Sequence, residues 1–121
     1  MGLDQYAFAT DNGTTCEGEP QYVWRKHAKL QEWAEQLFEA KTGNSAEELN
    51  CGYLELSGDD IESLKQLVEK KGLPDSPGGF FYGHQFQEES ASDYRAQDLE
   101  FCNWALVQIA EGQSVYYSCW W

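Results

Sequence analysis

The change of hydrophobic period within residues 51–74 constrains the fold more than any other feature of the sequence. Residues 51–56, CGYLEL, alternate apolar and polar side chains, as a half-buried strand does. Ser57 and Asp60 then have the spacing of an Asp variant of the capping box. The apolar residues that follow recur at helical spacing and are Ile61, Leu64, Leu67 and Val68. This segment predicts a strand joined directly to an amphipathic helix that ends near Gly72.

Two further helices and three further strands are expected elsewhere. One helix spans residues 23–41 and is ended by Gly43 in a left-handed conformation; the other spans residues 93–111. The apolar face of the helix at 23–41 is expected to consist of Val23, His27, Leu30, Ala34, Leu37 and Phe38. The remaining strands are expected at residues 3–10, 80–82 and 114–121.

These elements predict an α+β fold in a single domain that covers residues 1–121. The expected order is β-α-β-α-β-α-β, with a single sheet of about four strands and three helices packed mainly on one face. A chain of 121 residues supports one hydrophobic core but not two. Its aromatic content of 15% distinguishes it from disordered acidic chains, which are poor in aromatic residues. The pattern leaves the order of the strands within the sheet open.

The formal net charge of −13 limits the kinds of partner that the protein can have. Such a charge repels phosphate backbones, so we expect no direct binding of nucleic acid. It favours a protein partner with a basic surface, including one that would otherwise bind nucleic acid. The acidic helix faces that motivate this hypothesis carry Glu32, Glu35, Glu39, Glu47 and Glu48, although a solvated helix face has the same appearance.

The sequence predicts a cytoplasmic protein that does not contact membranes. No apolar run approaches the ~20 residues needed to span a bilayer, and the N-terminal MGLDQYAFAT lacks the basic start of a signal peptide. In that compartment Cys16, Cys51, Cys102 and Cys119 are expected to be reduced thiols. The cysteines and histidines are not spaced as metal ligands, and no motif implies a cofactor.

Arg25, Lys26 and His27 form a basic turn in this acidic chain, at the expected start of a helix. Cations there oppose the helix dipole, so a compensating interaction is expected. One explanation is structural: Arg25 or Lys26 pairs with Asp4 or Asp98, and Lys26 is partly buried beside the apolar face. The other explanation is an anion pocket, in which helix N–H groups, Arg25 and Lys26 converge on a phosphate or carboxylate. Internal ion pairs are the explanation that we favour.

If the basic turn binds a ligand, the site is expected to comprise Trp24, Arg25, Lys26 and Asp98, with Tyr82 and His84 at its mouth. The glycines near His84 do not have the spacing of a phosphate-binding loop. No residue is assigned as catalytic, because the chain contains no nucleophile motif. The sequence therefore favours binding over catalysis, with a small-ligand binding protein or a minor enzyme as the alternative.

Five short motifs occur in a fixed order: MGLDQY, WRKH, CGYLEL, GGFFYG and VYYSCWW. Together they resemble a family of small proteins common in bacteriophages and prophages, whose members begin Met-Gly-Leu-Asp, contain Trp-Arg-Lys and Gly-Phe-Phe-x-Gly, and end with tyrosines and tryptophan. The resemblance covers nearly the whole chain and implies a phage-type protein in the cytoplasm of a bacterial host. Relatives sometimes carry a phosphoglycerate-kinase label, but that enzyme is a much larger two-domain protein. Trp121 and the HQFQEESAS connection depart from the usual pattern.

Overall fold

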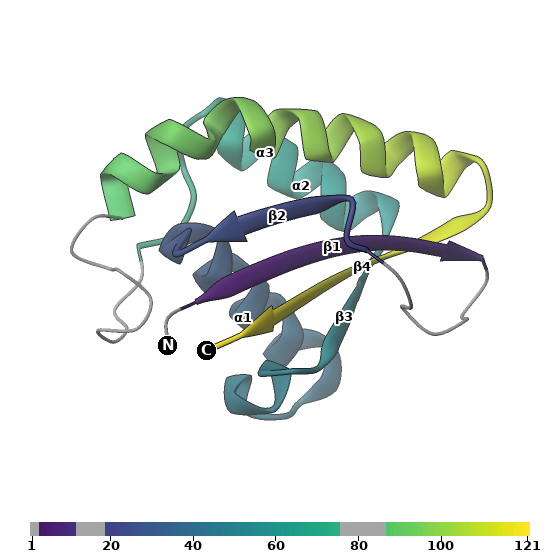
Figure 1. The fold of residues 1–121 in the computed structure, drawn as a ribbon, viewed down its shortest axis with the longest axis horizontal. Coiled ribbons are helices and arrows are strands. Elements are labelled where there is room, and N and C mark those ends of the chain that lie inside the picture. The colour runs from purple at the N-terminus through teal and green to yellow at the C-terminus, as the bar shows by residue number, and fades with distance from the viewer. Residues whose placement is uncertain (1–2, 12–18, 76–86) are drawn as a thin grey trace.

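One antiparallel sheet organises the protein, which is described by a computed structural model over residues 3–11, 19–75 and 87–121. Within these ranges the order of the four strands in the sheet is β2-β1-β4-β3 (Figure 1). The strands are β1 Asp4–Asp11, β2 Tyr22–Arg25, β3 Tyr53–Leu56 and β4 Gln113–Trp120. The first and last strands lie side by side at the centre and pair along their full length. Segments from the two ends of the chain therefore form the middle of the sheet.

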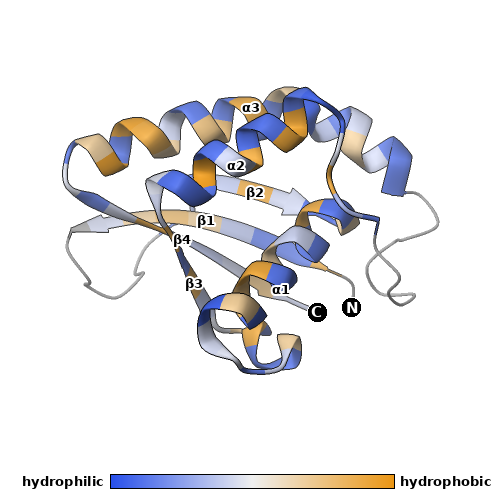
Figure 2. Ribbon diagram, turned by 180° about the vertical axis from the view of Figure 1, so that it is seen from behind, coloured by the Kyte–Doolittle hydropathy of each residue, from blue (hydrophilic) through white to orange (hydrophobic). Residues whose placement is uncertain are grey.

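The helices lie on one side of this sheet (Figures 1 and 2). They are α1 Ala28–Thr42, α2 Gly58–Glu69 and α3 Gln87–Ala110, and a short 3-10 helix, η1 Ala46–Leu49, connects α1 to β3. Figure 2 shows hydrophobic and hydrophilic residues interspersed along each helix, as is usual where one side contacts a sheet and the other contacts water. The core lies between the two layers.

Side chains along each strand alternate between the core and the opposite, outer face of the sheet. On β1, Gln5 and Ala7 are buried under the helices, whereas Tyr6 and Phe8 point the other way and are half-buried. On β4, Tyr117 is in the core. No helix within the described residues covers the outer face, and Val23, Tyr53 and Trp120 are exposed there.

Several expectations from the sequence are confirmed. The fold is α+β, with one four-stranded sheet in the described residues and three helices on one face of it. Ser57 caps α2: its side chain accepts a hydrogen bond from the Asp60 backbone N–H, and the Asp60 carboxylate accepts one from the Ser57 N–H. Gly43 follows α1 with a φ of 74°, which a residue without Cβ adopts without strain.

The prediction of a helix over residues 23–41 is wrong at its start. Tyr22–Arg25 is strand β2, which pairs with β1 so that Asp4 faces Arg25 and Tyr6 faces Val23. The helix begins only at Ala28, and Val23 lies exposed on the outer face instead of in the core. Backbone pairing with β1 makes residues 22–25 a strand, and the local hydrophobic period does not reveal this pairing.

The third helix is longer than predicted, because it starts at Gln87 and not at residue 93. Glu88 and Glu89 lie in its first turn, where their negative charge complements the helix dipole. Ser90 and Ser92, which precede the predicted start, therefore lie inside the helix. The strand expected at residues 80–82 lies outside the described residues. Along the described chain the order is β-β-α-β-α-α-β, with η1 before β3, so the expected order β-α-β-α-β-α-β is not confirmed.

The capping box of α2 gives the first prediction. Ser57→Ala removes a side-chain acceptor from the first turn, and we expect the free energy of unfolding to fall by about 1 kcal/mol, measured by urea denaturation. Ser63→Ala is the matched control because Ser63 is exposed within the same helix, where alanine has the higher helix propensity. A loss no greater for Ser57→Ala than for Ser63→Ala would contradict the role of the cap.

Candidate functional site

The buried carboxylate of Asp98 is the centre of a polar network between the sheet and α3. Its Oδ1 accepts a hydrogen bond of 2.7 Å from the Trp24 indole Nε1 on β2. Its Oδ2 lies 2.7 Å from His27 Nε2, in the turn between β2 and α1. All three residues are almost completely buried, His27 at 0% and Asp98 at 1% exposure. A carboxylate removed from water in this way requires such donors.

Two buried glutamines extend the network through the core. The Gln5 side chain accepts a hydrogen bond from the His27 N–H at 2.9 Å and donates one to the His27 carbonyl at 3.1 Å. Gln5 Nε2 also donates to the Tyr117 hydroxyl at 2.8 Å, and that hydroxyl donates to Gln31 Oε1. The turn that contains His27 is therefore attached to β1, β4 and α1 as well as to α3.

Tyr94 covers this network from α3. Its ring stacks on the His27 imidazole with 5.3 Å between the ring centroids, and its hydroxyl accepts a hydrogen bond of 3.0 Å from the Arg25 N–H. His27 Nδ1 is buried and has no hydrogen-bond partner in the part of the chain that the structure describes. Because His27 and Asp98 are almost completely buried and hydrogen-bonded to each other, the pair fastens β2 and α1 to α3.

The residues of the basic turn differ in their exposure to solvent. Arg25 and Lys26 are exposed, whereas His27 between them and the helix is buried. Arg25 Nε lies 3.7 Å from Asp4 Oδ1, and the two side chains are 72% and 44% exposed, so this is a surface ion pair. The prediction that Lys26 is partly buried is wrong: its φ of 55° places it in a left-handed turn that directs the chain from β2 into α1.

Of the described residues assigned to a ligand site, the structure brings only Trp24 and Asp98 together. Of the ion pairs expected from the sequence, Arg25 with Asp4 forms, whereas the partners of Asp98 are Trp24 and His27 and not Arg25 or Lys26. The reason is that residues 22–25 form a strand and not the start of a helix. In a strand, Trp24 points to the core and its neighbour Arg25 points to the outer face. Tyr82 and His84 lie outside the described residues.

Lys29 is the buried cation that the sequence did not reveal. It is 7% exposed, and its Nζ lies 2.9 Å from both Asp75 Oδ1 and Glu88 Oε1. Burial lowers the pKa of Lys29, but hydrogen bonds to Glu88 and Asp75 and their negative charges outweigh it and raise the pKa above its usual value. A lysine two residues after His27 with acidic partners 46 and 59 positions away gives no local signal.

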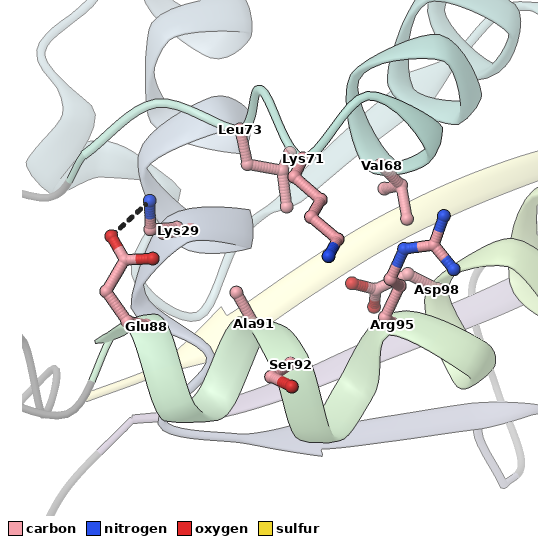
Figure 3. A pocket seen from close by; sticks show the side chains of 9 residues that line it. All are labelled: Lys29, Val68, Lys71, Leu73, Glu88, Ala91, Ser92, Arg95 and Asp98. Atoms are coloured by element: carbon pink, nitrogen blue, oxygen red, sulfur yellow. Dashed lines mark ion pairs between the residues drawn. The ribbon is translucent and has the colours of Figure 1, made fainter.

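A pocket of about 270 Å³ opens beside this ion pair, between α2 and α3. Lys71, just after the end of α2, extends toward α3, where Arg95 and Asp98 lie (Figure 3). Val68, Leu73 and Ala91 supply apolar walls. The pocket does not include Trp24, Arg25 or Lys26, so it differs from the site expected from the sequence.

The outer face of the sheet carries a second candidate site, which we call the aromatic face: Tyr6, Phe8, Tyr53, Tyr116 and Trp120. Ring centroids lie 6.5 Å apart for Tyr6 and Phe8, 6.1 Å for Phe8 and Tyr53, and 6.4 Å for Tyr53 and Tyr116. Trp120, at the end of β4, is 62% exposed. These aromatic residues come from β1, β3 and β4, so only the pairing of the strands brings them together.

Thiol chemistry is disfavoured at two of the cysteines. Burial raises the pKa of Cys102 and of Cys119 to about 12, so at neutral pH both are protonated and poor nucleophiles. Cys51 is exposed, and Cys16 lies outside the described residues. Among the residues that the structure covers, no three metal-binding side chains gather in one place.

Comparison of the chain with protein-family models, with curated proteins and with solved structures finds no match. Each helix within the described residues is too short or too polar to span a bilayer.

The network around Asp98 gives the second prediction. Asp98→Ala leaves the Trp24 and His27 donors without an acceptor, and we expect the free energy of unfolding to fall by on the order of 3 kcal/mol. Asp4→Ala, which breaks only the surface pair with Arg25, is expected to cost less than about 1 kcal/mol. Chemical denaturation of each variant measures both values.

A double-mutant cycle tests the partners of Asp98. Trp24→Phe removes only the indole donor, so its effect and that of Asp98→Ala should not add, whereas Arg25→Ala and Asp98→Ala should add. Strong coupling of Asp98 to Arg25 in place of Trp24 would contradict the network.

Cysteine reactivity gives the third prediction. In the folded protein at pH 8, iodoacetamide should modify Cys51 and leave Cys102 and Cys119 unmodified, because burial raises the pKa of those two thiols to about 12. Peptide mass spectrometry after timed quenching measures the modification, and the urea-unfolded protein provides the fully reactive control. Rapid labelling of Cys102 in the folded state would be inconsistent with this core.

Proposed function

We propose that this protein binds a protein partner with a basic surface through the aromatic face of its sheet. The observation that carries the proposal is the array of aromatic rings in mutual contact on a face that no described helix covers. Contiguous exposed apolar surface on a soluble domain commonly marks an interaction site. Tyrosine and tryptophan are also the residues most enriched among those that dominate binding energy at interfaces.

Charge supports a basic partner. Asp4 lies on β1 opposite Trp120, and Glu55 lies on β3 opposite Tyr116, so carboxylates border the aromatic rings. Among the described residues of this face, Arg25 is the cation, and it is paired with Asp4. With a formal net charge of −13, the whole chain attracts a positively charged partner at long range and accelerates its association.

Two other occupants of the aromatic face are less compatible with these charges. Aromatic side chains on a sheet can stack on the bases of single-stranded nucleic acid, but such surfaces combine the aromatics with a positively charged groove. Here the bordering groups are mainly carboxylates, which repel phosphates. A second copy of the chain would bring two charges of −13 together, which opposes self-association.

The setting of this interaction is part of the same proposal. The motif resemblance favours a phage-type protein in the bacterial cytoplasm, so the partner would be a basic host or phage protein. The alternative site at Trp24, Arg25, Lys26 and Asp98 receives less support, because Trp24 and Asp98 are enclosed while the two cations are exposed. A catalytic role receives none from the buried His27 and Asp98 pair.

The fourth prediction tests the aromatic face with matched surface variants. The double variant Tyr53→Ser/Trp120→Ser removes two exposed rings, and Val107→Ser on α3 is the control. Tyr53 and Val107 are similarly exposed, at 51% and 54%. Each protein is used as bait in a nuclease-treated bacterial lysate, and retained proteins are identified by mass spectrometry. We expect a basic protein to be retained by the wild type and by Val107→Ser, and to be lost from the double variant.

The captured protein is then purified and titrated calorimetrically. Its affinity should fall at least about tenfold with the double variant and should weaken as salt is raised, since screening reduces charge attraction. Equal binding by all three baits, an acidic partner, or retention that depends on nucleic acid would each contradict the proposal. Circular dichroism of the variants verifies that the sheet is intact.

A further inference from the structure

We propose that the pocket between α2 and α3 binds a small organic anion, in which a carboxylate or phosphate group is attached to an apolar body. The pocket lies on the helical side of the molecule, so this activity is separate from binding at the aromatic face (Figures 2 and 3). The inference rests on which lining charges already have partners and which do not.

Two cations of the pocket have no carboxylate partner among the described residues. Neither Lys71 nor Arg95 forms an ion pair within residues 3–11, 19–75 and 87–121. Arg95 Nη2 donates a hydrogen bond of 3.2 Å to the Glu69 carbonyl, which orients the guanidinium, and Arg95 Nε is buried without a partner in the described chain. A fixed guanidinium with unused donors is suited to bind a carboxylate or phosphate.

The carboxylates of the pocket, by contrast, are already bound. Glu88 is paired with Lys29 at 2.9 Å, and Asp98 receives hydrogen bonds from Trp24 and His27. These carboxylates lower the local positive potential, but each of them already has a partner in the protein: Glu88 is neutralised by Lys29, and both oxygens of Asp98 accept a hydrogen bond. Among the charged groups that line the pocket, those without an opposite charge in the described residues are therefore the cations Lys71 and Arg95, and an anion is the complementary group.

The backbone places Lys71 in this position at some cost. Lys71 has a φ of 55°, a left-handed conformation that is unfavourable for a residue with a Cβ, although Gly72 follows it directly. Glycine at position 71 would adopt this conformation more easily, so local folding does not require lysine there. The lysine side chain extends toward α3 and the pocket (Figure 3).

Apart from Ser92, the uncharged lining is apolar, and the volume sets the size of the ligand. Val68 and Leu73 are buried, and Ala91 faces them from α3. The pocket holds about 270 Å³, whereas a protein cavity of ~150 Å³ is sufficient for benzene. One ring or short chain with one anionic group therefore fits, but a nucleotide with several phosphates does not.

The fifth prediction uses phenyl phosphate as the probe, titrated calorimetrically in a phosphate-free buffer of low ionic strength. We expect saturable binding that is at least about tenfold tighter than the binding of inorganic phosphate or of benzyl alcohol. Inorganic phosphate supplies the anionic group alone, and benzyl alcohol supplies the apolar body alone. Sodium benzoate, with a carboxylate on the same ring, should also bind.

The variants Lys71→Asn and Arg95→Gln each remove one cation and should weaken the binding of phenyl phosphate about tenfold. Lys26→Asn is the matched control: Lys26 has the same φ of 55° and is also exposed, but it does not line the pocket. Asparagine tolerates this backbone conformation, so both lysine variants should fold. Ala91→Leu keeps every charge and fills the apolar part, and it should exclude the ring.

No saturable binding of phenyl phosphate would overturn the inference. So would an equal loss of affinity in Lys26→Asn and Lys71→Asn, since that result would indicate a general effect of net charge. Tight binding that survives in Ala91→Leu would place the ring elsewhere. Because the aromatic-face variant Tyr53→Ser/Trp120→Ser leaves the pocket intact, it should bind phenyl phosphate as the wild type does, which keeps this test independent of the proposed protein partner.

Discussion

The buried carboxylate of Asp98 is the interaction on which the arrangement of the elements depends. It lies on α3, and its two donors come from β2 and from the turn before α1, so one side chain connects the edge of the sheet with two helices. An unsatisfied carboxylate in this position would be highly unfavourable, which restricts how α3 can dock against the sheet. Gln5 and Tyr117 extend the hydrogen-bond network toward the centre of the sheet. Each of these buried polar groups also needs a partner at a defined position.

The two sides of the sheet have different physical properties. The helical side has an apolar core crossed by hydrogen-bonded polar side chains, and a pocket lies where the end of α2 passes α3. The outer side has aromatic rings bordered by carboxylates and no helical cover in the described residues. The helix-covered side contains the hydrophobic core, and the uncovered side is the one on which we propose that a partner binds.

The candidate residues were only partly predictable, and the errors have one physical origin. Asp4 and Asp98 were the expected partners of Arg25 or Lys26; Asp4 does pair with Arg25, but Asp98 binds Trp24 and His27. A helical period was assumed through residues 23–27, which placed Lys26 beside the core and Trp24 away from it. In the strand that actually forms, Trp24 points inward, and the buried lysine is Lys29 in the first turn of α1. Adjacent side chains of a strand point to opposite faces, so an error in the assigned element changes which of two neighbouring residues is buried and which is exposed.

The sequence by itself determined the features that depend on neighbours within a few positions. These include the capping box at Ser57 and Asp60, the left-handed stop at Gly43, the apolar face of α2 and the α+β class. Tertiary structure alone decided the identity of β2, the β2-β1-β4-β3 order, the aromatic face and the pocket. Local elements follow from hydrogen bonds and periodicity that short segments contain. Strand pairing and buried ion pairs depend on residues that lie far apart in the chain, and their energies exist only once the chain has folded.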